Sequence, residues 1–160
     1  MKILNSSRIN LILMKGTYNL IIHQREDMHI KVGAIGEDIE FKEGYYIYIG
    51  SAMNSLTARI KRHLKKEKKI HWHIDYLLKY ENNTIEEVLF NISDEKIECK
   101  LAQLISKKGQ DIDKFGSTDC NCNSHLIYFK NYQNAIQSVE NAYNKLNIPF
   151  YNLEYFKTLI

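Results

Sequence analysis

Residues 45–52 read YYIYIGSA, and this stretch predicts the central strand of the fold. In an extended strand, alternate side chains point to opposite faces of the sheet. Tyr46, Tyr48 and Gly50 therefore share one face, and the two isoleucines between them share the other. One face of the strand is thus apolar, while the other presents two phenols and a bare stretch of backbone.

A basic amphipathic helix is predicted directly after this strand, over residues 55–68. Leu56, Ile60 and Leu64 recur at four-residue intervals, the spacing of one helical face. Residues 59–69 contain seven Lys or Arg and one Glu, a local charge of 7 − 1 = +6 in a chain of net charge +3. Such a concentrated positive stripe suits a polyanion, although most charge runs are simply solvated helix faces.

Length and composition are those of a single globular domain, which we expect to comprise residues 1–160. This length is enough to bury one hydrophobic core. No apolar run approaches the roughly 18 residues that a membrane span needs. The N-terminal residues lack a cleavage signal, so we expect them in the mature protein. Three cysteines, an odd number, argue against a disulfide framework and favour a cytoplasmic location.

The remaining pattern predicts an α+β fold, a small and mainly antiparallel sheet flanked by helices. Short connections between the first strands favour antiparallel pairing. Asp94 is the expected N-cap of the third helix. Strands are expected over residues 16–23, 30–35, 39–41, 45–50, 84–92 and 124–129, and helices over 55–68, 71–80, 94–107 and 131–146.

Several motifs, taken together and in order, resemble the GIY-YIG nuclease superfamily. Tyr48-Ile49-Gly50 follows Gly16-Thr17-Tyr18 on an earlier strand and precedes Arg59 on a helix. A wider set is similar to a mainly archaeal branch of Uri-type endonucleases. It comprises Val32-Gly33, Ser51-Ala52, Arg62-His63-Leu64, HWHIDYL at 71–77, Glu98-Cys99 and FGSTDCNCNSHL at 115–126.

The resemblance covers residues 14–130, which we expect to form a GIY-YIG-like core. Compared with compact members of the superfamily, an extra strand or hairpin, residues 30–41, is inserted between the two tyrosine motifs. Residues 131–160 are expected to form a C-terminal helical addition.

By this resemblance the chain is a divalent-metal-dependent endonuclease that hydrolyses DNA by a one-metal mechanism. Tyr18 and Tyr48 would orient or deprotonate the attacking water, with His63 as proton acceptor. Arg59 would stabilise charge that develops on the phosphate. Glu98 would hold Mg²⁺ or Mn²⁺. The alternatives are ordinary strand tyrosines and a first-turn glutamate that interacts with the helix dipole.

The basic helix supplies the predicted contacts to DNA, with RNA as an alternative partner. Phosphate contacts of this kind position a nucleic acid without reading its sequence. The alternative function is a nucleic-acid-binding module without catalysis that uses residues 59–69. The oligomeric state is left open. The residues assigned to nucleic-acid binding are Gly50, Arg62, Lys65, Lys66 and Lys69.

Cys120-x-Cys122-x-x-His125 offers potential zinc ligands, and Cys99, His71 or His73 could complete a set. The C-x-C spacing is tighter than that of most zinc motifs. The alternative is that the cysteines are small buried hydrophobes and that His125 forms a hydrogen-bonded turn with Asp119. The sequence leaves both interpretations open.

Overall fold

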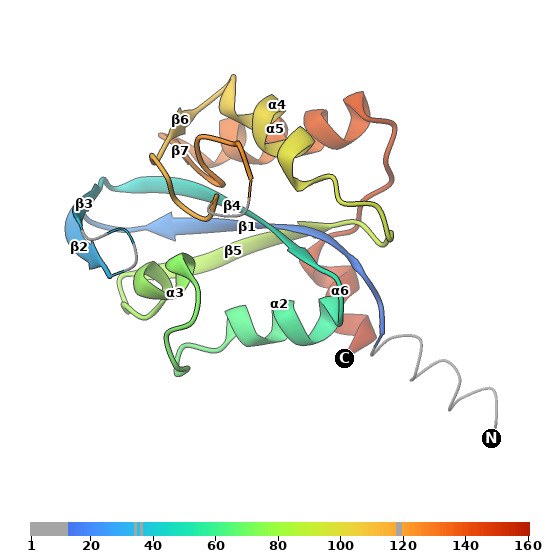
Figure 1. Cartoon of the computed structure of the whole chain (residues 1–160), viewed down its shortest axis with the longest axis horizontal. Coiled ribbons are helices and arrows are strands. Elements are labelled where there is room, and N and C mark those ends of the chain that lie inside the picture. Colours follow the sequence, from blue (N-terminus) through green and yellow to red (C-terminus); the bar gives the residue numbers. More distant parts are fainter. Residues whose placement is uncertain (1–12, 34, 36, 118–119) are drawn as a thin grey trace.

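The computed structural model describes residues 13–33, 35, 37–117 and 120–160 (Figure 1). The predictions for residues 1–12 and for Asp119 lie outside these ranges. In chain order the elements are β1 (Gly16–Gln24), β2 (Met28–Val32), β3 (Glu37–Phe41), β4 (Gly44–Ala52), α2 (Leu56–Leu64), α3 (His73–Leu78), β5 (Asn83–Phe90), α4 (Glu98–Ser106), β6 (Gln110–Asp111), β7 (Leu126–Phe129), α5 (Tyr132–Lys145) and α6 (Leu153–Leu159).

These elements form the predicted α+β fold. A five-stranded antiparallel sheet has the order β5-β1-β4-β7-β6, and β2 and β3 form a separate two-stranded sheet. The β2–β3 pair is the expected hairpin, inserted between β1 and β4. The register between β1 and β4 places Tyr18 opposite Gly50 and Leu20 opposite Tyr48. The two tyrosine motifs therefore lie side by side at the centre of the sheet.

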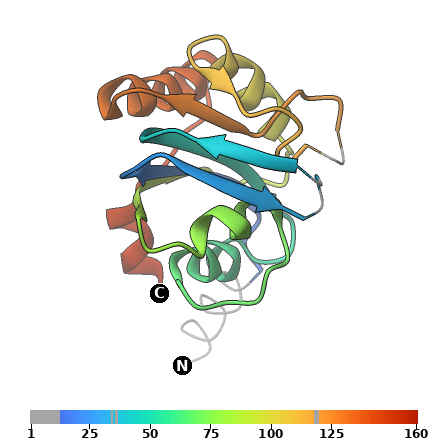
Figure 2. The same cartoon turned by 90° about the vertical axis from the view of Figure 1, so that its left-hand side faces the viewer.

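Helices cover both faces of the five-stranded sheet, with α2, α3 and α6 on one side and α4 and α5 on the other (Figures 1 and 2). The alternation predicted for β4 is confirmed. Tyr46 and Tyr48 pack in the hydrophobic core on the α2 side. Ile47 and Ile49 pack in the second core, on the α4 and α5 side. Both faces of the central strand are therefore buried.

The helix α2 differs from its prediction in its buried face. Leu64 is 37% exposed, whereas His63 is only 2% exposed. At 100° per residue, a seven-residue step from Leu56 returns to within about 20° of the starting direction, while an eight-residue step is about 80° away. The inward face therefore consists of Leu56, Ile60 and His63.

The predicted ends of two helices are wrong. The helix α2 ends at Leu64, because the Lys68 ammonium folds back and donates to three carbonyl oxygens of its last turn, at 2.8–3.3 Å. The helix α4 begins at Glu98, so Asp94 is not its N-cap. Ile97 is buried in the core and fixes the start of α4, while residues 94–96 are exposed.

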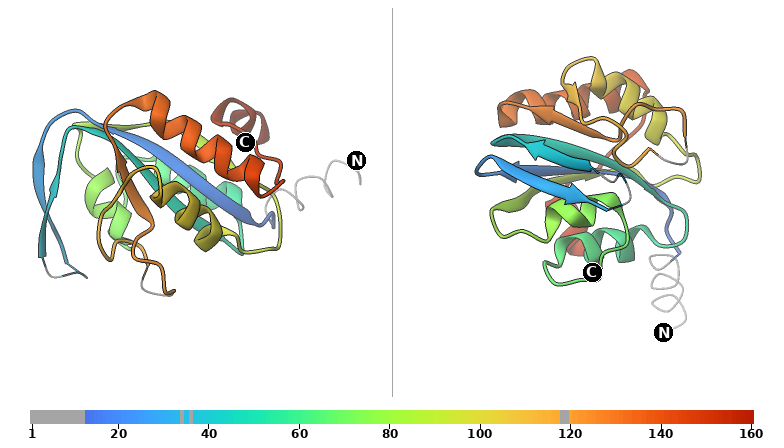
Figure 3. Two further views of the ribbon diagram at one scale, coloured as in Figure 1. Left: turned by 90° about the horizontal axis from the view of Figure 1, so that it is seen from above. Right: turned by 60° about the vertical axis from the view of Figure 1, so that its left-hand side comes forward.

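The C-terminal region adds two helices rather than one. The helix α5 lies across the sheet beside α4, as seen from above in Figure 3. The short helix α6 and the two-residue strand β6 carry little periodic signal and were not predicted. Phe156 anchors α6 in the core on the α2 side. Within the described residues, none of the helices is long and apolar enough to cross a membrane.

Candidate active site

A cavity of about 640 Å³ opens where β1, β4, α2, α3 and α4 meet. Three of the four predicted catalytic side chains line it, namely Tyr18, Tyr48 and Arg59, together with the predicted metal ligand Glu98. A larger hollow of about 710 Å³, between α4 and residues 121–124, is lined by three lysines and by none of these four. The chemistry predicted from the sequence therefore gathers in the first cavity.

The two tyrosines are neighbours at the base of this cavity. The ring centroids of Tyr18 and Tyr48 are 6.3 Å apart, and the side chains are 1% and 7% exposed. A Cβ atom at Gly50 would lie 2.5 Å from the Tyr18 hydroxyl. Gly50 therefore makes room for the phenol. The strand continues through Gly50 to Ala52.

His63 lies behind Tyr18 rather than in the cavity wall. Its Nε2 atom is 2.8 Å from the Tyr18 hydroxyl oxygen. Burial lowers the pKa of His63 to about 3 and raises the pKa of Tyr18 to about 12, the latter rise being opposed by the nearby Arg59 guanidinium. Burial also raises the pKa of Tyr48 well above its ordinary value. At neutral pH the phenols and the imidazole are all uncharged, and Tyr18 and His63 share one hydrogen bond.

Arg59 is held at the cavity by two contacts. One guanidinium nitrogen donates to the Ser51 carbonyl at 3.2 Å. The guanidinium also stacks on Trp72, with 4.3 Å between Cζ and the ring centroid. A planar guanidinium in this position presents its remaining donors to a bound anion.

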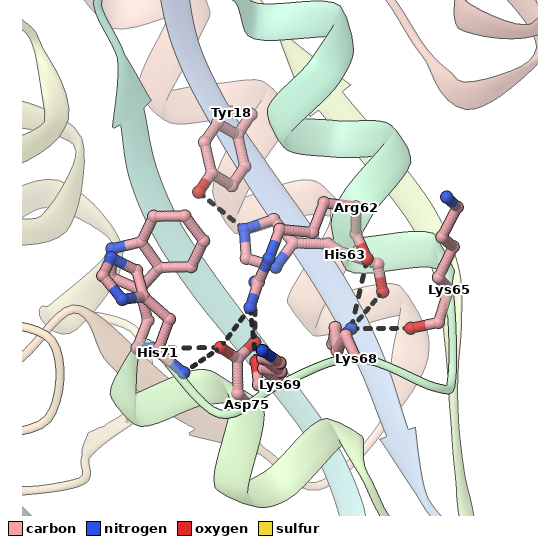
Figure 4. Close-up of polar contacts among 9 residues, drawn as sticks. Tyr18, Arg62, His63, Lys65, Lys68, Lys69, His71 and Asp75 are labelled. Carbon is pink, nitrogen blue, oxygen red and sulfur yellow. Dashed lines mark hydrogen bonds and ion pairs between the residues drawn. The ribbon is translucent and has the colours of Figure 1, made fainter.

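Arg62 does not belong to the predicted nucleic-acid surface. Its guanidinium forms a two-pronged ion pair with the fully buried Asp75, at 2.9 and 3.1 Å, and donates to the Lys69 carbonyl (Figure 4). It also stacks on the face of Trp72, at 4.5 Å. Burial alone would raise the pKa of Asp75, but the hydrogen bonds from Arg62 and from two backbone amides hold it below its usual value. The pair joins α2 to α3, so Arg62 has a structural role.

The lysines assigned to nucleic acid divide into two groups. The Lys66 ammonium donates to the carbonyls of Leu78, Tyr80 and Asn83 and to the Asn83 side chain, so it ties α2 to the start of β5. Lys65 and Lys69 are exposed, and their side chains stay available to a polyanion. The assignment of Lys66 therefore changes to a structural one, because backbone oxygens satisfy its donors.

Glu98 is the first residue of α4 and is half-buried. Among the described residues that line the cavity, Glu98 is the only one with an acidic side chain. Its negative charge contributes to the raised pKa values of both Tyr18 and Tyr48, which shows that the carboxylate lies near the two phenols. A carboxylate oxygen beside an open cavity suits a Mg²⁺ or Mn²⁺ ion that keeps several waters.

Sequence reasoning missed the roles of Trp72 and Asp75 and left that of His73 undefined. Trp72 lies between the guanidinium groups of Arg59 and Arg62. The backbone N–H of Gly116 donates to Nδ1 of His73 at 3.0 Å, so the neutral ring carries its proton on Nε2. The sequence feature that could have indicated these roles is that Trp72, His73 and Asp75 lie in one block, residues 71–77, directly after the basic run.

The cavity has a cluster of potential metal ligands beside it. One ligand atom from each of Cys99, Cys120, Cys122 and His125 lies within 4.8 Å of all the others. Cys99, Cys120 and His125 also line the cavity. Of the possible fourth ligands named from the sequence, the structure brings Cys99 to the motif and leaves His73 bonded to Gly116.

Comparison with known proteins identifies a family. The curated proteins yielded no match, and neither did the solved structures. A family model described as "Domain of unknown function DUF123" matches residues 17–148. The match begins within β1, contains every site residue described above and extends through α5. Because it spans most of the chain, this protein belongs to the DUF123 family.

Proposed function

We propose that this protein is a Uri-type member of the GIY-YIG superfamily and hydrolyses phosphodiester bonds in DNA with the help of a divalent cation. One observation carries the proposal. Tyr18, Tyr48, Arg59 and Glu98 come from four elements spread over 80 positions of the chain and line a single cavity, with His63 hydrogen-bonded to Tyr18. Convergence of this kind favours a reaction centre over a set of ordinary strand tyrosines.

The two phenols would orient the attacking water. A buried phenol with a raised pKa is a poor base on its own. The hydrogen bond between Tyr18 and His63 fixes the direction of the Tyr18 hydroxyl, but an imidazole whose pKa is about 3 is too weak a base to take the phenol proton. We therefore assign the water-facing role to the tyrosines and treat His63 as the residue that positions Tyr18.

Arg59 would bind the phosphate and stabilise the charge that develops on it in the transition state. Its stacking on Trp72 and its bond to the Ser51 carbonyl hold the guanidinium in place before substrate binds. Such preorganisation reduces the cost of ordering a long side chain at the moment of reaction.

The residues around the cavity fit a hard divalent cation, Mg²⁺ or Mn²⁺. Glu98 offers the carboxylate oxygen such an ion prefers, and the open volume leaves room for waters and a phosphate oxygen. When bound, the cation would act as a Lewis acid on the leaving oxygen. Around that site, the exposed Lys65 and Lys69 would contact the DNA backbone, and Lys96 would do so at the rim of the cavity.

A cleavage assay with matched acidic variants tests the proposal. The full chain is incubated with nicked, branched and linear DNA, and with RNA, in Mg²⁺, in Mn²⁺ or in a chelator. We expect metal-dependent cleavage that falls by about 100-fold or more in Glu98→Gln. The control is Glu95→Gln, which removes an exposed carboxylate three residues earlier and should cleave within about 2-fold of the wild type.

Absence of cleavage by the folded protein on all of these substrates would contradict the proposal. In that case, salt-sensitive DNA binding unchanged in Tyr48→Phe and Glu98→Gln would identify a non-catalytic binding module.

A further inference from the structure

The side chains of Cys99, Cys120, Cys122 and His125 form a cluster that the proposed hydrolysis does not use. Their ligand atoms all lie within 4.8 Å of one another, and the three cysteines are free thiols. These are all of the cysteines in the chain. Three thiols from two distant segments therefore meet at one imidazole that is 4% exposed.

Two of the distances in this cluster are close to those of a tetrahedral zinc site, and every other pair of ligand atoms lies within 4.8 Å. Bond lengths of about 2.3 Å for Zn–S and 2.05 Å for Zn–N place neighbouring ligand atoms about 3.6–3.8 Å apart around a tetrahedron. In this structure, His125 Nε2 lies 3.4 Å from the Cys120 sulfur and 3.9 Å from the Cys99 sulfur. The four side chains are thus grouped as the direct ligands of one metal ion would be.

We propose that Cys99, Cys120, Cys122 and His125 bind one zinc ion in a closed structural site. Three thiolates and an imidazole favour zinc over the hard cations proposed for the cavity, because Mg²⁺ and Mn²⁺ prefer oxygen ligands. Four protein ligands complete the tetrahedron and leave no position for a reactive water, so this zinc stabilises structure rather than catalysing hydrolysis.

The zinc joins the first turn of α4 to the loop between β6 and β7. Cys99 is the second residue of α4, while the other three ligands follow one another in the loop that leads into β7. The described part of this loop buries one large apolar side chain, Phe115. A metal cross-link compensates for such a small apolar contribution.

The cross-link also bears on the cavity, because Cys99 directly follows Glu98. Zinc would hold the first turn of α4 against the loop, and with it the Glu98 carboxylate. The backbone of His125 adds a second anchor, since its carbonyl accepts from the Ile49 amide of β4 at 2.9 Å. The zinc therefore acts as a positioning element for one wall of the cavity.

Metal analysis of the untagged full chain, purified with a reductant and without added metal, tests the proposal. We expect about one zinc per chain in the wild type. In Cys99→Ser and Cys122→Ser the zinc content should fall below about a tenth of that value. His125→Asn should lose zinc, while His29→Asn, at an exposed position on β2, should keep it.

Two further measurements keep the test independent of folding defects and of nuclease activity. Cobalt added to chelator-stripped wild type should give the intense absorption of tetrahedral cobalt thiolate. Glu98→Gln should retain one zinc whether or not the chain cleaves DNA. A zinc-free wild type that is folded, an iron-loaded one, zinc retained by both cysteine variants, or a weak octahedral cobalt spectrum would each overturn the proposal.

Discussion

The two faces of the five-stranded sheet differ sharply although the same strand builds both. On the α4 and α5 side, Ile47 packs in a mostly aliphatic layer with Leu101 and Val139, and one buried hydrogen bond joins Tyr143 to Asn19. On the α2 and α3 side, Tyr18, Tyr48 and His63 are buried at comparable depth. The right-hand view of Figure 3 shows the sheet between these two layers. The comparison teaches that one strand can contribute to stability on one face and present chemistry on the other, because its side chains alternate.

Burying polar groups is costly unless they are paired. The α2 side meets this cost with the Tyr18–His63 hydrogen bond and the Arg62–Asp75 ion pair. The Arg62 guanidinium of this ion pair stacks on Trp72, and the same ring contacts the Arg59 guanidinium. On the α2 and α3 side of the sheet the polar contacts therefore depend on one another, so a substitution at one residue should affect its neighbours. On the α4 and α5 side the effects of separate substitutions should be independent.

The largest loss of stability is expected when the ion pair between Arg62 and Asp75 is removed. Arg62→Ala leaves the Asp75 carboxylate buried without its partner, so the free energy of unfolding should fall by about 3–5 kcal/mol. Lys65→Ala, which removes an exposed charge from the end of the same helix, should change it by less than about 0.5 kcal/mol. Denaturant unfolding checks both. Equal effects would show that Arg62 is a surface residue after all.

The next prediction compares substitutions at two adjacent positions of β4, whose side chains face opposite sides of the sheet. Ile47→Ala opens a cavity in the aliphatic layer and should lower the free energy of unfolding by about 2–4 kcal/mol. Tyr48→Phe removes only a hydroxyl, so the stability should change by about 1 kcal/mol or less. Cleavage should instead fall about 100-fold. The contrast between the two faces fails if Tyr48→Phe loses stability and keeps activity.

Lowering the pH should destabilise the fold through His63, on the α2 and α3 side of the sheet. The pKa of His63 is about 3 in the folded protein and about 6.5 in the unfolded chain. Below pH 6.5 the unfolded chain binds the extra proton, so the stability contributed by neutral His63 decreases as the pH falls from 6.5 toward 3. At pH 5 this linkage amounts to about 2 kcal/mol.

His63→Gln provides the comparison for this pH effect, measured by thermal unfolding between pH 7.5 and pH 5. The variant should lose about 2 kcal/mol less than the wild type over this range, since Gln does not titrate. Asp75 titrates at lower pH and does not interfere, because its pKa is lowered further in the folded state. Parallel pH profiles for the two proteins would refute a buried neutral His63.

The smallest effects should come from the exposed lysines. Lys65→Gln and Lys69→Gln should leave stability unchanged, and each should reduce the slope of log affinity against log salt by about 1 if its side chain contacts a DNA phosphate. Lys66→Gln should instead destabilise the fold, since its ammonium binds four oxygen atoms between the end of α3 and the start of β5. Salt titrations of DNA binding separate the two groups.

The sequence by itself determined the central strand and the inserted hairpin. These features depend on local patterns, which are the period-2 alternation of residues 45–50 and the short connections on either side. The register of β1 on β4, which brings Tyr18 and Tyr48 together, was decided by the fold, because the β2–β3 hairpin separates these two strands along the chain. The end of α2 and the start of α4 were less predictable, since Lys68 binds the last carbonyls of the first and the buried Ile97 precedes the second, whereas Ser55 caps the start of α2 locally.

Only the tertiary structure decided which members of the basic run bind other parts of the chain and which are left to solvent. Arg62 and Lys66 have the same charge as Lys65 and Lys69, but their partners lie in α3 and at the start of β5. Composition cannot reveal such pairings, because they join residues that are not neighbours on one helix. The meeting of Cys99 with the loop cysteines was likewise only one of several combinations in the sequence, and packing of α4 on the sheet selected it.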